Sequence, residues 1–290
     1  MPKNSTRYIN KPSRKKRPEY FGLMLIPSEQ LKNVVTSYVR ITTYGKHTDH
    51  AALQVPDERI QLIFDFKTSN IEKAVMVEGI RHKYGFLHRT GIVEQLKIKL
   101  RPGIFYSFFQ RPAHFFADRT IPLKDAIGQK ASCFDTVFTA KTHAARLRVI
   151  ERIFKKLAKE SLPIDSKIQQ IVESIYTGNG NISGNELCTQ VGMGYRQFHD
   201  LFNKWIGASF KIFCNIVKFN KTRLDLRHLH GQSITAIALK NGYRDQAHLT
   251  SDFKKFHGLT PLQVRNRYAS LFTTVLITPT VKKITIYRPD

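Results

Sequence analysis

The chain has 290 residues, and its 41% hydrophobic content is typical of two folded domains rather than a disordered polymer. No run of eighteen apolar residues lacks a charge, and no apolar stretch follows the basic start, so we expect neither a transmembrane helix nor a secretory signal. The 47 Lys and Arg residues against 22 Asp and Glu give a net charge of +25, which favours a polyanionic partner. Charge alone does not select nucleic acid over another anionic surface.

Cysteine and histidine spacing gives little support for a metal or redox centre. Cys133, Cys188 and Cys214 lie far apart, so they form neither a disulfide framework nor a metal-binding pair. We expect reduced thiols in a cytoplasmic protein without a cofactor or metal. His82 and His88 are six residues apart, but we interpret them as ordinary surface or core histidines rather than ligands.

The N-terminal part divides into a tail and a mixed domain. Residues 1–18 carry seven basic and no acidic side chains, which predicts a disordered tail, or alternatively an arm lying along DNA phosphates. Residues 19–142 mix helix and strand patterns and are expected to form an α+β sensory or dimerisation domain. Helical spacing is found at Leu31, Val34, Val35 and Tyr38, whereas strands are expected at Arg59–Phe66, Ala74–Val77, Gln95–Leu100 and Phe105–Phe109. The aromatic residues at 105–109 are either core or the lining of an effector pocket.

Residues 143–164 are predicted to be a linker helix. Leu147, Ile150, Phe154 and Leu157 follow one another three and four apart, the spacing of a coiled-coil seam. Two heptads are too few to separate a homodimer contact from a stripe packed on the same chain. After Leu162 and Pro163, residues 165–268 are expected to be all α-helical, and the β-branched residues 269–290 form a C-terminal extension that contains a strand-like segment.

The helical region contains an internal repeat of about fifty residues. Each copy has a short apolar helix, a glycine and a second helix, an order that predicts a tight turn between two packed helices. The copies are Glu186–Phe210 and Ala236–Pro261, in which Gly192 matches Gly242 and Gly207 matches Gly258. A helix from about Ser209 to Leu229 joins them, and at 1.5 Å per residue it spans about 30 Å, close to one turn of B-DNA.

The second helix of each copy has an apolar face and a polar face. Phe198, Leu201, Phe202 and Trp205 form the expected inner face of the first, and Leu249, Phe253 and Phe256 that of the second. A recognition helix needs this arrangement, because it presents donors and acceptors to the major groove from a rigid base. The candidate DNA-contacting residues are Arg196, His199, Asp200, Asn203, Gln246, Ala247, Thr250, Ser251 and Lys254.

Residues 165–268 resemble the AraC/XylS-type DNA-binding domain. The resemblance rests on Glu186, Leu187, Val191–Met193, Phe198, Phe202, Gly207, Ser209 and Phe210 in the first copy, and on Ile237, Ala238, Gly242, Tyr243, Asp245, Leu249, Phe253–Lys255, Gly258, Thr260 and Pro261 in the second. Arginine is common in this family where Asp200 and Ser251 stand here. The resemblance therefore implies the docking mode more strongly than particular base contacts. The N-terminal half also resembles an uncharacterised domain that precedes such pairs, through Val55–Asp57, Leu62–Phe64, Arg101–Gly103 and Arg111–Ala113.

These observations predict an α+β domain followed by an all-α domain with two helix-turn-helix units joined by a long helix. The function they indicate is a one-component transcription regulator that binds double-stranded DNA and contacts RNA polymerase, with a small-molecule effector in the N-terminal domain and a homodimer left open. An enzyme is not expected, because a repair methyltransferase would need a cysteine cluster that this sequence lacks. The alternative is a constitutive architectural DNA-binding protein without an effector.

Overall fold

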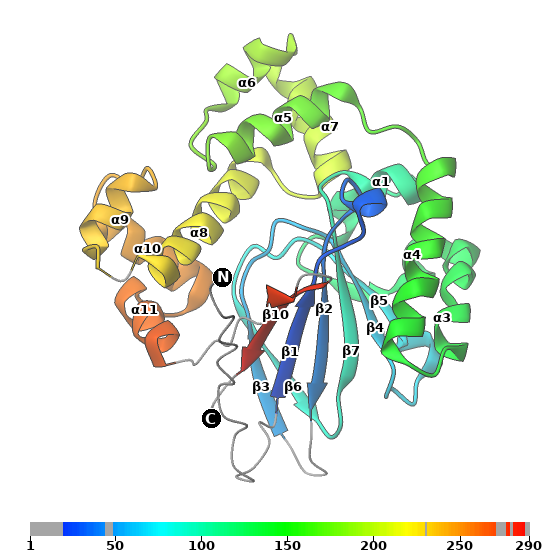
Figure 1. The fold of residues 1–290 in the computed structure, drawn as a ribbon. Helices are drawn as coiled ribbons and strands as arrows, with labels where there is room; N and C mark the ends of the chain where they lie inside the picture. The colour runs from blue at the N-terminus through cyan, green and yellow to red at the C-terminus, as the bar shows by residue number, and fades with distance from the viewer. Residues whose placement is uncertain (1–19, 44–48, 230, 271–276, 279–280, 288–290) are drawn as a thin grey trace, which may run out of the picture.

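An antiparallel sheet forms the centre of the N-terminal half. The computed structural model describes residues 20–43, 49–229, 231–270, 277–278 and 281–287. Eight strands pair in the order β8 (Thr120–Pro122), β5 (Val75–Glu78), β4 (Gln61–Asp65), β7 (Glu94–Leu100), β2 (Val35–Thr43), β1 (Tyr20–Leu25), β10 (Val281–Tyr287) and β9 (Ile277–Thr278) (Figure 1). A separate ribbon pairs β3 (Asp49–Gln54) with β6 (Gly85–Thr90). The predicted basic tail, residues 1–18, lies outside the described residues.

The strand-like C-terminal segment returns to the N-terminal sheet. Strand β10 pairs antiparallel with β1, so that Gly22 lies opposite Ile286 and Leu25 opposite Lys283. The chain therefore crosses from the helical region back to the edge of the sheet where it began, as Figure 1 shows with the last strand beside the first. A strand in this extension is confirmed, although its partner was not predicted.

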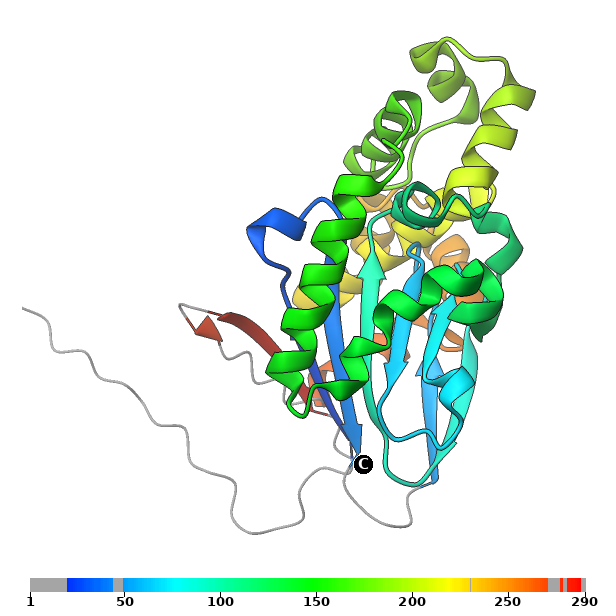
Figure 2. The same ribbon diagram turned by 90° about the vertical axis from the view of Figure 1, so that its right-hand side faces the viewer.

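Helices cover one face of the sheet. They are α1 (Ile104–Phe109), α2 (Leu123–Ile127), α3 (Thr136–Thr139) and α4 (His143–Glu160), with short 3-10 helices at Glu29–Leu31, Ile71–Lys73, Ala113–Phe116 and Gly128–Phe134. Figure 2 shows α4 and its neighbours lying in front of the strands. Thr142 caps α4 by accepting a hydrogen bond from the backbone of Ala145.

Two secondary-structure expectations were wrong. The residues at helical spacing from Leu31 to Tyr38 do not form a helix. Leu31 ends a 3-10 helix and Val35 begins strand β2, because β-branched residues favour an extended backbone. Residues 104–109 form helix α1 rather than a strand, and all six are buried. An apolar run buried on every side has no periodicity that could separate helix from strand, and Gly103, in the left-handed region at φ 87°, starts the helix.

The stripe on α4 packs against its own chain. Ile150 and Phe154 are fully buried, and Leu147 and Leu157 pack on the same core at partial burial. Glu151, on the same helix, accepts hydrogen bonds from the backbone of Ser28 and the hydroxyl of Tyr38. Both contacts tie α4 to the sheet, so the intrachain alternative accounts for the coiled-coil spacing.

The C-terminal region is all helical, as predicted. Its helices are α5 (Ser166–Thr177), α6 (Gly184–Val191), α7 (Tyr195–Ile206), α8 (Phe210–His228), α9 (Ile234–Lys240), α10 (Gln246–His257) and α11 (Pro261–Ser270). The side chains of Ser209 and Ser233 cap α8 and α9, and Pro261 is the first residue of α11. Leu224 of α8 is 49% exposed. No helix in the described ranges is long and apolar enough to cross a membrane.

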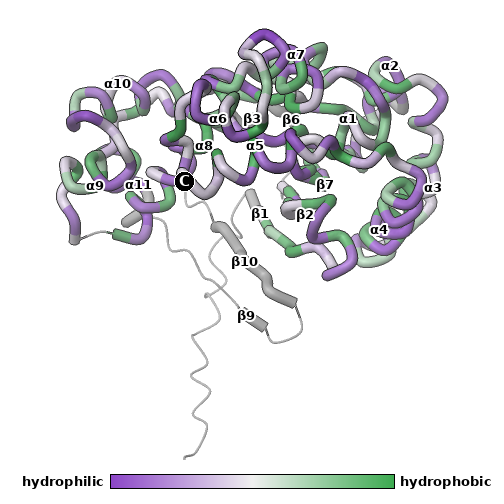
Figure 3. The backbone as a smooth tube through the Cα atoms, turned by 90° about the horizontal axis from the view of Figure 1, so that it is seen from above, coloured by the Kyte–Doolittle hydropathy of each residue, from purple (hydrophilic) through white to green (hydrophobic). Residues whose placement is uncertain are grey.

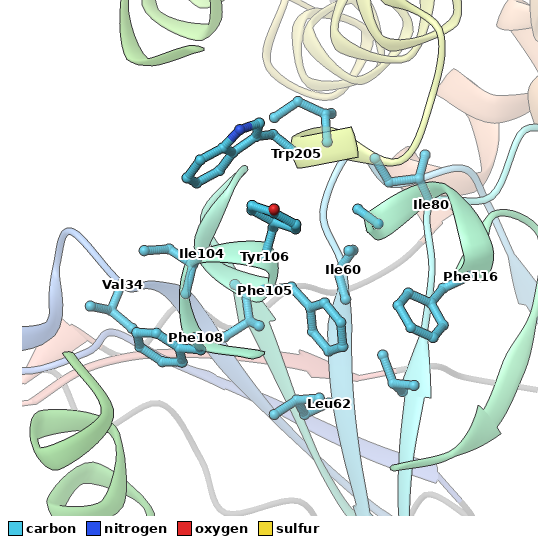
Figure 4. Close-up of a cluster of buried hydrophobic side chains, with 14 of the residues drawn as sticks. Val34, Ile60, Leu62, Ile80, Ile104, Phe105, Tyr106, Phe108, Phe116 and Trp205 are labelled. Carbon is cyan, nitrogen blue, oxygen red and sulfur yellow. The ribbon is translucent and has the colours of Figure 1, made fainter. Parts of the chain in front are cut away.

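The buried apolar residues form two cores, and their boundary lies inside α8. One core runs from Leu31 to Val217 and joins the sheet, α4 and the first helix-turn-helix unit. The other runs from Phe219 to Val264 and belongs to the second unit. Figure 4 shows where the first unit enters the larger core, with Trp205 of α7 above Tyr106 of α1. Viewed from above, the second unit occupies one end of the molecule and α3 and α4 the other (Figure 3).

Candidate nucleic-acid interface

The first helix-turn-helix unit consists of α6 and α7. The side chain of Ser183 accepts from the backbone of Glu186, whose carboxylate accepts from the backbone of Ser183, and this reciprocal pair fixes the start of α6. The helix ends at Gly192, which has the left-handed φ of 60° that the turn requires. Helix α7 then begins after Gly194.

The inner face of α7 is a stack of aromatic rings. Phe198 and Phe202 lie parallel with ring centroids 5.9 Å apart, and Phe202 meets Phe213 of α8 edge-on at 5.6 Å. Trp205 points elsewhere, because its ring packs 4.6 Å from Tyr106 in the N-terminal domain. The predicted inner face therefore contacts two different neighbours, α8 and α1.

The outer face of α7 carries the predicted polar residues. Arg196, His199 and Asp200 are exposed and Asn203 is half-buried. The amide of Asn203 hydrogen-bonds the ring of His199 at 3.0 Å, and Asp200 Oδ1 lies 3.5 Å from His199 Nδ1. Asp200 thus faces His199 rather than Arg196, and no carboxylate among the described residues lies within ion-pair distance of Arg196. The Arg196 guanidinium is available to a partner.

The second unit repeats this design with α9 and α10. Asp245 caps α10 by accepting from the backbone of His248 at 2.7 Å, and this bond with the hydrogen bond from Arg244 lowers the pKa of its carboxyl. On the inner side Phe253 is fully buried, with its ring centroid 4.9 Å from that of Phe219. Phe256 belongs to the same core, with its ring centroid 5.3 Å from that of Phe219.

The outer face of α10 also carries the predicted residues. Gln246, Ala247, Ser251 and Lys254 are exposed, and Thr250 is half-buried. Gln246 Oε1 accepts from Thr235 Oγ1 of α9 at 2.9 Å, which orients its amide, while Thr250 Oγ1 donates to the carbonyl of Gln246. These five residues border a single open groove of about 540 Å³.

The groove on α7 is lined by residues beyond those predicted to contact DNA. It has a volume of about 730 Å³ and is lined by Gly194, Tyr195, Arg196, Gln197, Asp200, Leu201 and Lys204. His199 and Asn203 are not among these residues. Sequence reasoning missed Tyr195, Gln197 and Lys204, although Lys204 continues the four-residue spacing of Arg196 and Asp200. Tyr195 is 58% exposed at the first turn, where its aromatic ring gave no sign of an outward position.

The two units are held at a fixed separation. Helix α8 has 19 residues, which at 1.5 Å each span about 28 Å. Asn181, ahead of the first unit, donates to the carbonyl of Asn241 in the second, and a Cβ at Gly242 would lie 2.2 Å from its amide oxygen. Asn241 in turn donates to Asp225 of α8 in a buried bond. The orientation of α7 relative to α10 is therefore set by direct contacts.

The remaining candidate sites show ordinary packing. Burial raises the pKa of the Cys133 thiol to about 11 and that of the Cys214 thiol to about 12, so both are protonated at neutral pH. His82 pairs with Asp118 at 2.9 Å, and the side chain of His88 lies outside the described residues. Over the part of the chain that the structure describes, no three His, Cys, Asp or Glu side chains are grouped as a metal site.

Comparison with known proteins places a domain in each half of the chain. Residues 187–267 match the model of a helix-turn-helix domain, HTH_18, and residues 24–122 match a domain of unknown function, DUF6597. Uncharacterised HTH-type transcriptional regulators of Staphylococcus aureus strains MSSA476 and N315 are each 30% identical over 109 residues. That match covers 37% of this chain and only 14% of each relative.

Solved structures give a weaker likeness. A transcriptional regulator from Chromobacterium violaceum, described as AraC-type, is 23% identical over 36% of this chain and 92% of its own, with a TM-score of 0.33. ToxT from Vibrio cholerae is 10% identical over 86% of this chain and 97% of its own, with a TM-score of 0.37.

Proposed function

We propose that this chain, in which residues 187–267 are a helix-turn-helix domain of the AraC type behind a DUF6597 domain, is a sequence-specific DNA-binding transcription regulator. The observation that carries the proposal is the pair of outward polar faces on α7 and α10, which are joined by α8, a helix about 28 Å long and so comparable with one turn of B-DNA. One chain then places two recognition helices in successive major-groove segments without a partner subunit.

Arg196 and Gln246 are the proposed base readers. Arginine is the commonest reader of guanine, and the Arg196 guanidinium has no carboxylate partner among the described residues. Gln246 lies in the first turn of α10, where an amide can bond the N6 and N7 positions of adenine. Lys204 and Lys254 supply positive charge beside these readers, suited to phosphate contacts that fix the register.

His199, Asp200, Asn203, Ala247, Thr250 and Ser251 are proposed as the remaining contact residues. Asp200, whose Oδ1 lies 3.5 Å from His199 Nδ1, is suited to accept a hydrogen bond from a cytosine amino group. Ser251 and Ala247 are small enough to bring the α10 backbone close to a thymine methyl group. The regulator contacts RNA polymerase in this proposal, acts as a one-component sensor in the cytoplasm and has no catalytic role.

The test compares operator DNA, selected from a random pool, with random DNA at fixed salt. Arg196→Ala and Gln246→Ala should each lower operator affinity by about 1–3 kcal/mol and affect random DNA much less, because base contacts are specific. Lys159→Ala removes an exposed charge from the end of α4 and is the matched control. Equal losses on both DNAs would favour the alternative, a constitutive architectural protein, for which binding falls uniformly with salt at every site.

A further inference from the structure

A cavity lies where three parts of the chain meet. It has a volume of about 850 Å³, within the range of small-molecule sites. Its walls come from the sheet domain around α1, from the end of the linker at residues 158–164 and from α5, the first helix of the helical region. The linker is fixed there, because the backbone of Leu162 donates to Ser107 and the Ser107 hydroxyl donates back to the Leu162 carbonyl.

Most of the wall is apolar. Ile104 and Phe108 contribute from α1, Leu162 from the linker, and Ile168 and Val172 from α5. Leu162 is 41% exposed, so apolar surface remains open to solvent at this junction. A cavity of this composition gains free energy by enclosing an apolar body.

The polar end of the cavity is formed by Arg101 and Tyr176. Arg101 Nε donates to the carbonyl of Lys32, which positions the guanidinium, and none of the described carboxylates lies within ion-pair distance of it. The described residues offer the Tyr176 hydroxyl no hydrogen-bond partner. Burial raises the pKa of Tyr176 strongly, and Arg101 lies near enough to act in the opposite direction. The two side chains therefore present unused donors to the same space.

The other charged groups at the cavity are already satisfied or face solvent. Arg59 binds Asp57 through two nitrogens, at 2.5 and 3.0 Å, and lies 3.5 Å from Glu58. Glu58 accepts from Asn220 of α8 at 2.7 Å, and burial raises its pKa. Glu173 also lines the cavity, where its side chain is exposed to solvent. Among the described residues that line the cavity, only Arg101 then supplies a cation with nitrogen donors that have no partner.

We propose that this cavity binds an amphipathic organic acid, whose carboxylate is held by Arg101 and Tyr176 and whose apolar body fills the space between α1 and α5. Guanidinium and carboxylate match in geometry, and a phenol adds a third donor. The ligand bridges the sheet domain and the helical region. Binding therefore changes how firmly α5 is held against α1, and this regulatory consequence rests on the proposed function.

The chain provides its own reporter for the binding test. It has a single tryptophan, Trp205, whose ring lies beside Gly103 and Ile164 at the cavity. We would titrate the full-length protein with 4-phenylbutyrate, octanoate and cyclohexanecarboxylate, and with 4-phenylbutanol and 4-phenylbutylamine as neutral and cationic counterparts. We expect saturable changes in emission, with 4-phenylbutyrate bound at least tenfold more tightly than the alcohol or the amine.

Two variants and a control test whether Arg101 and Tyr176 bind the carboxylate of the ligand. Arg101→Gln should remove the preference for the acid over the alcohol. Tyr176→Phe should lower the affinity for the acid several-fold and leave the affinity for the alcohol unchanged. Arg119→Gln, an exposed arginine away from the cavity, should change neither, and thermal melting confirms that each variant is folded. The proposal is overturned if none of the three acids saturates below about 1 mM, if acid and alcohol bind alike, or if Arg101→Gln keeps the preference.

DNA is absent from this titration, so its outcome is independent of the proposed regulator function. In a second arm, 4-phenylbutyrate should shift operator affinity of the natural protein and leave that of Arg101→Gln unchanged. Binding without such a shift would retain the site and overturn its regulatory role. Loss of DNA binding in every sample would instead overturn the proposed function and leave the binding result standing.

Discussion

His257 shows how a single residue gives the second unit a pH-dependent stability. It ends α10 at 8% exposure, and its Nδ1 has no hydrogen-bond partner among the described residues. Burial, with a smaller contribution from Arg223, lowers its pKa to about 4. The imidazole is therefore neutral in the folded protein over a range in which the unfolded chain, with a pKa near 6.5, is already protonated.

Because the unfolded state binds the extra proton, stability falls as pH drops from about 6.5 towards 4. The loss at His257 should reach about 2–3 kcal/mol at the lower end. His257→Phe keeps an apolar ring of similar size and does not titrate, so urea unfolding of this variant should show a shallower decline over that window. His228→Phe alters an exposed histidine and should keep the natural slope. Equal slopes for both variants would contradict the burial argument.

At the scale of elements, α7 and α10 contact the N-terminal domain through equivalent residues. Each ends at a glycine in the left-handed region, Gly207 at φ 92° and Gly258 at φ 76°. A Cβ at Gly207 would lie 2.7 Å from the carbonyl oxygen of Ala113, and one at Gly258 would lie 2.8 Å from the ring of Tyr84. The glycines thus have two roles. They end the helix, and without a Cβ they leave room for the close approach of the N-terminal domain.

Gly258→Ala should therefore lower the free energy of unfolding by more than backbone strain alone would. Gly192 has a similar φ of 60° with no atom within 4 Å of a Cβ, so Gly192→Ala measures the strain alone, about 1 kcal/mol. We expect Gly258→Ala to destabilise the full-length protein by more than this value. In a double-mutant cycle, the additional loss of stability should disappear when Tyr84 is also replaced by alanine. If the two glycine variants cost the same and Tyr84→Ala has no effect on either, the packed contact has no energetic role.

The sequence predicted the helical elements better than the contacts between them. Gly192, Ser209 and Pro261 are local signals for a turn, a cap and a first helical residue, and each has that role in the structure. The outward faces of α7 and α10 followed from a 3.6-residue period in the same way. In contrast, the contact of Tyr84 with Gly258 joins residues far apart in the sequence, and no local pattern encodes such a pairing. Helix α1 was missed because a fully buried run has no polar face to mark its period.

At the scale of the whole molecule, the boundary between the two hydrophobic cores does not coincide with the boundary between the sheet domain and the helical repeat. The first helix-turn-helix unit shares a continuous core with the sheet domain, through Trp205 on Tyr106 and through α4. The second unit has a smaller core of its own, built around Phe219 and Phe253 and bordered by Val55 of the sheet domain. Smaller cores hide less apolar surface, so we expect the second unit to open more readily than the rest.

Native-state hydrogen exchange tests this division, with Phe253→Ala as the perturbation. Truncating a fully buried phenylalanine should cost about 3–5 kcal/mol, because it removes apolar contacts and leaves a cavity. If the cores are separate, the faster exchange is confined to residues 219–264, and amides in α4 and β7 keep their protection. Phe115→Ala, at a side chain 58% exposed, should change neither region. A uniform loss of protection from β7 to α10 would instead mean that the contacts of Tyr84 and Asn220 join the two cores into one cooperative unit. A ligand bound at α5 would then act on α7 and α10 together.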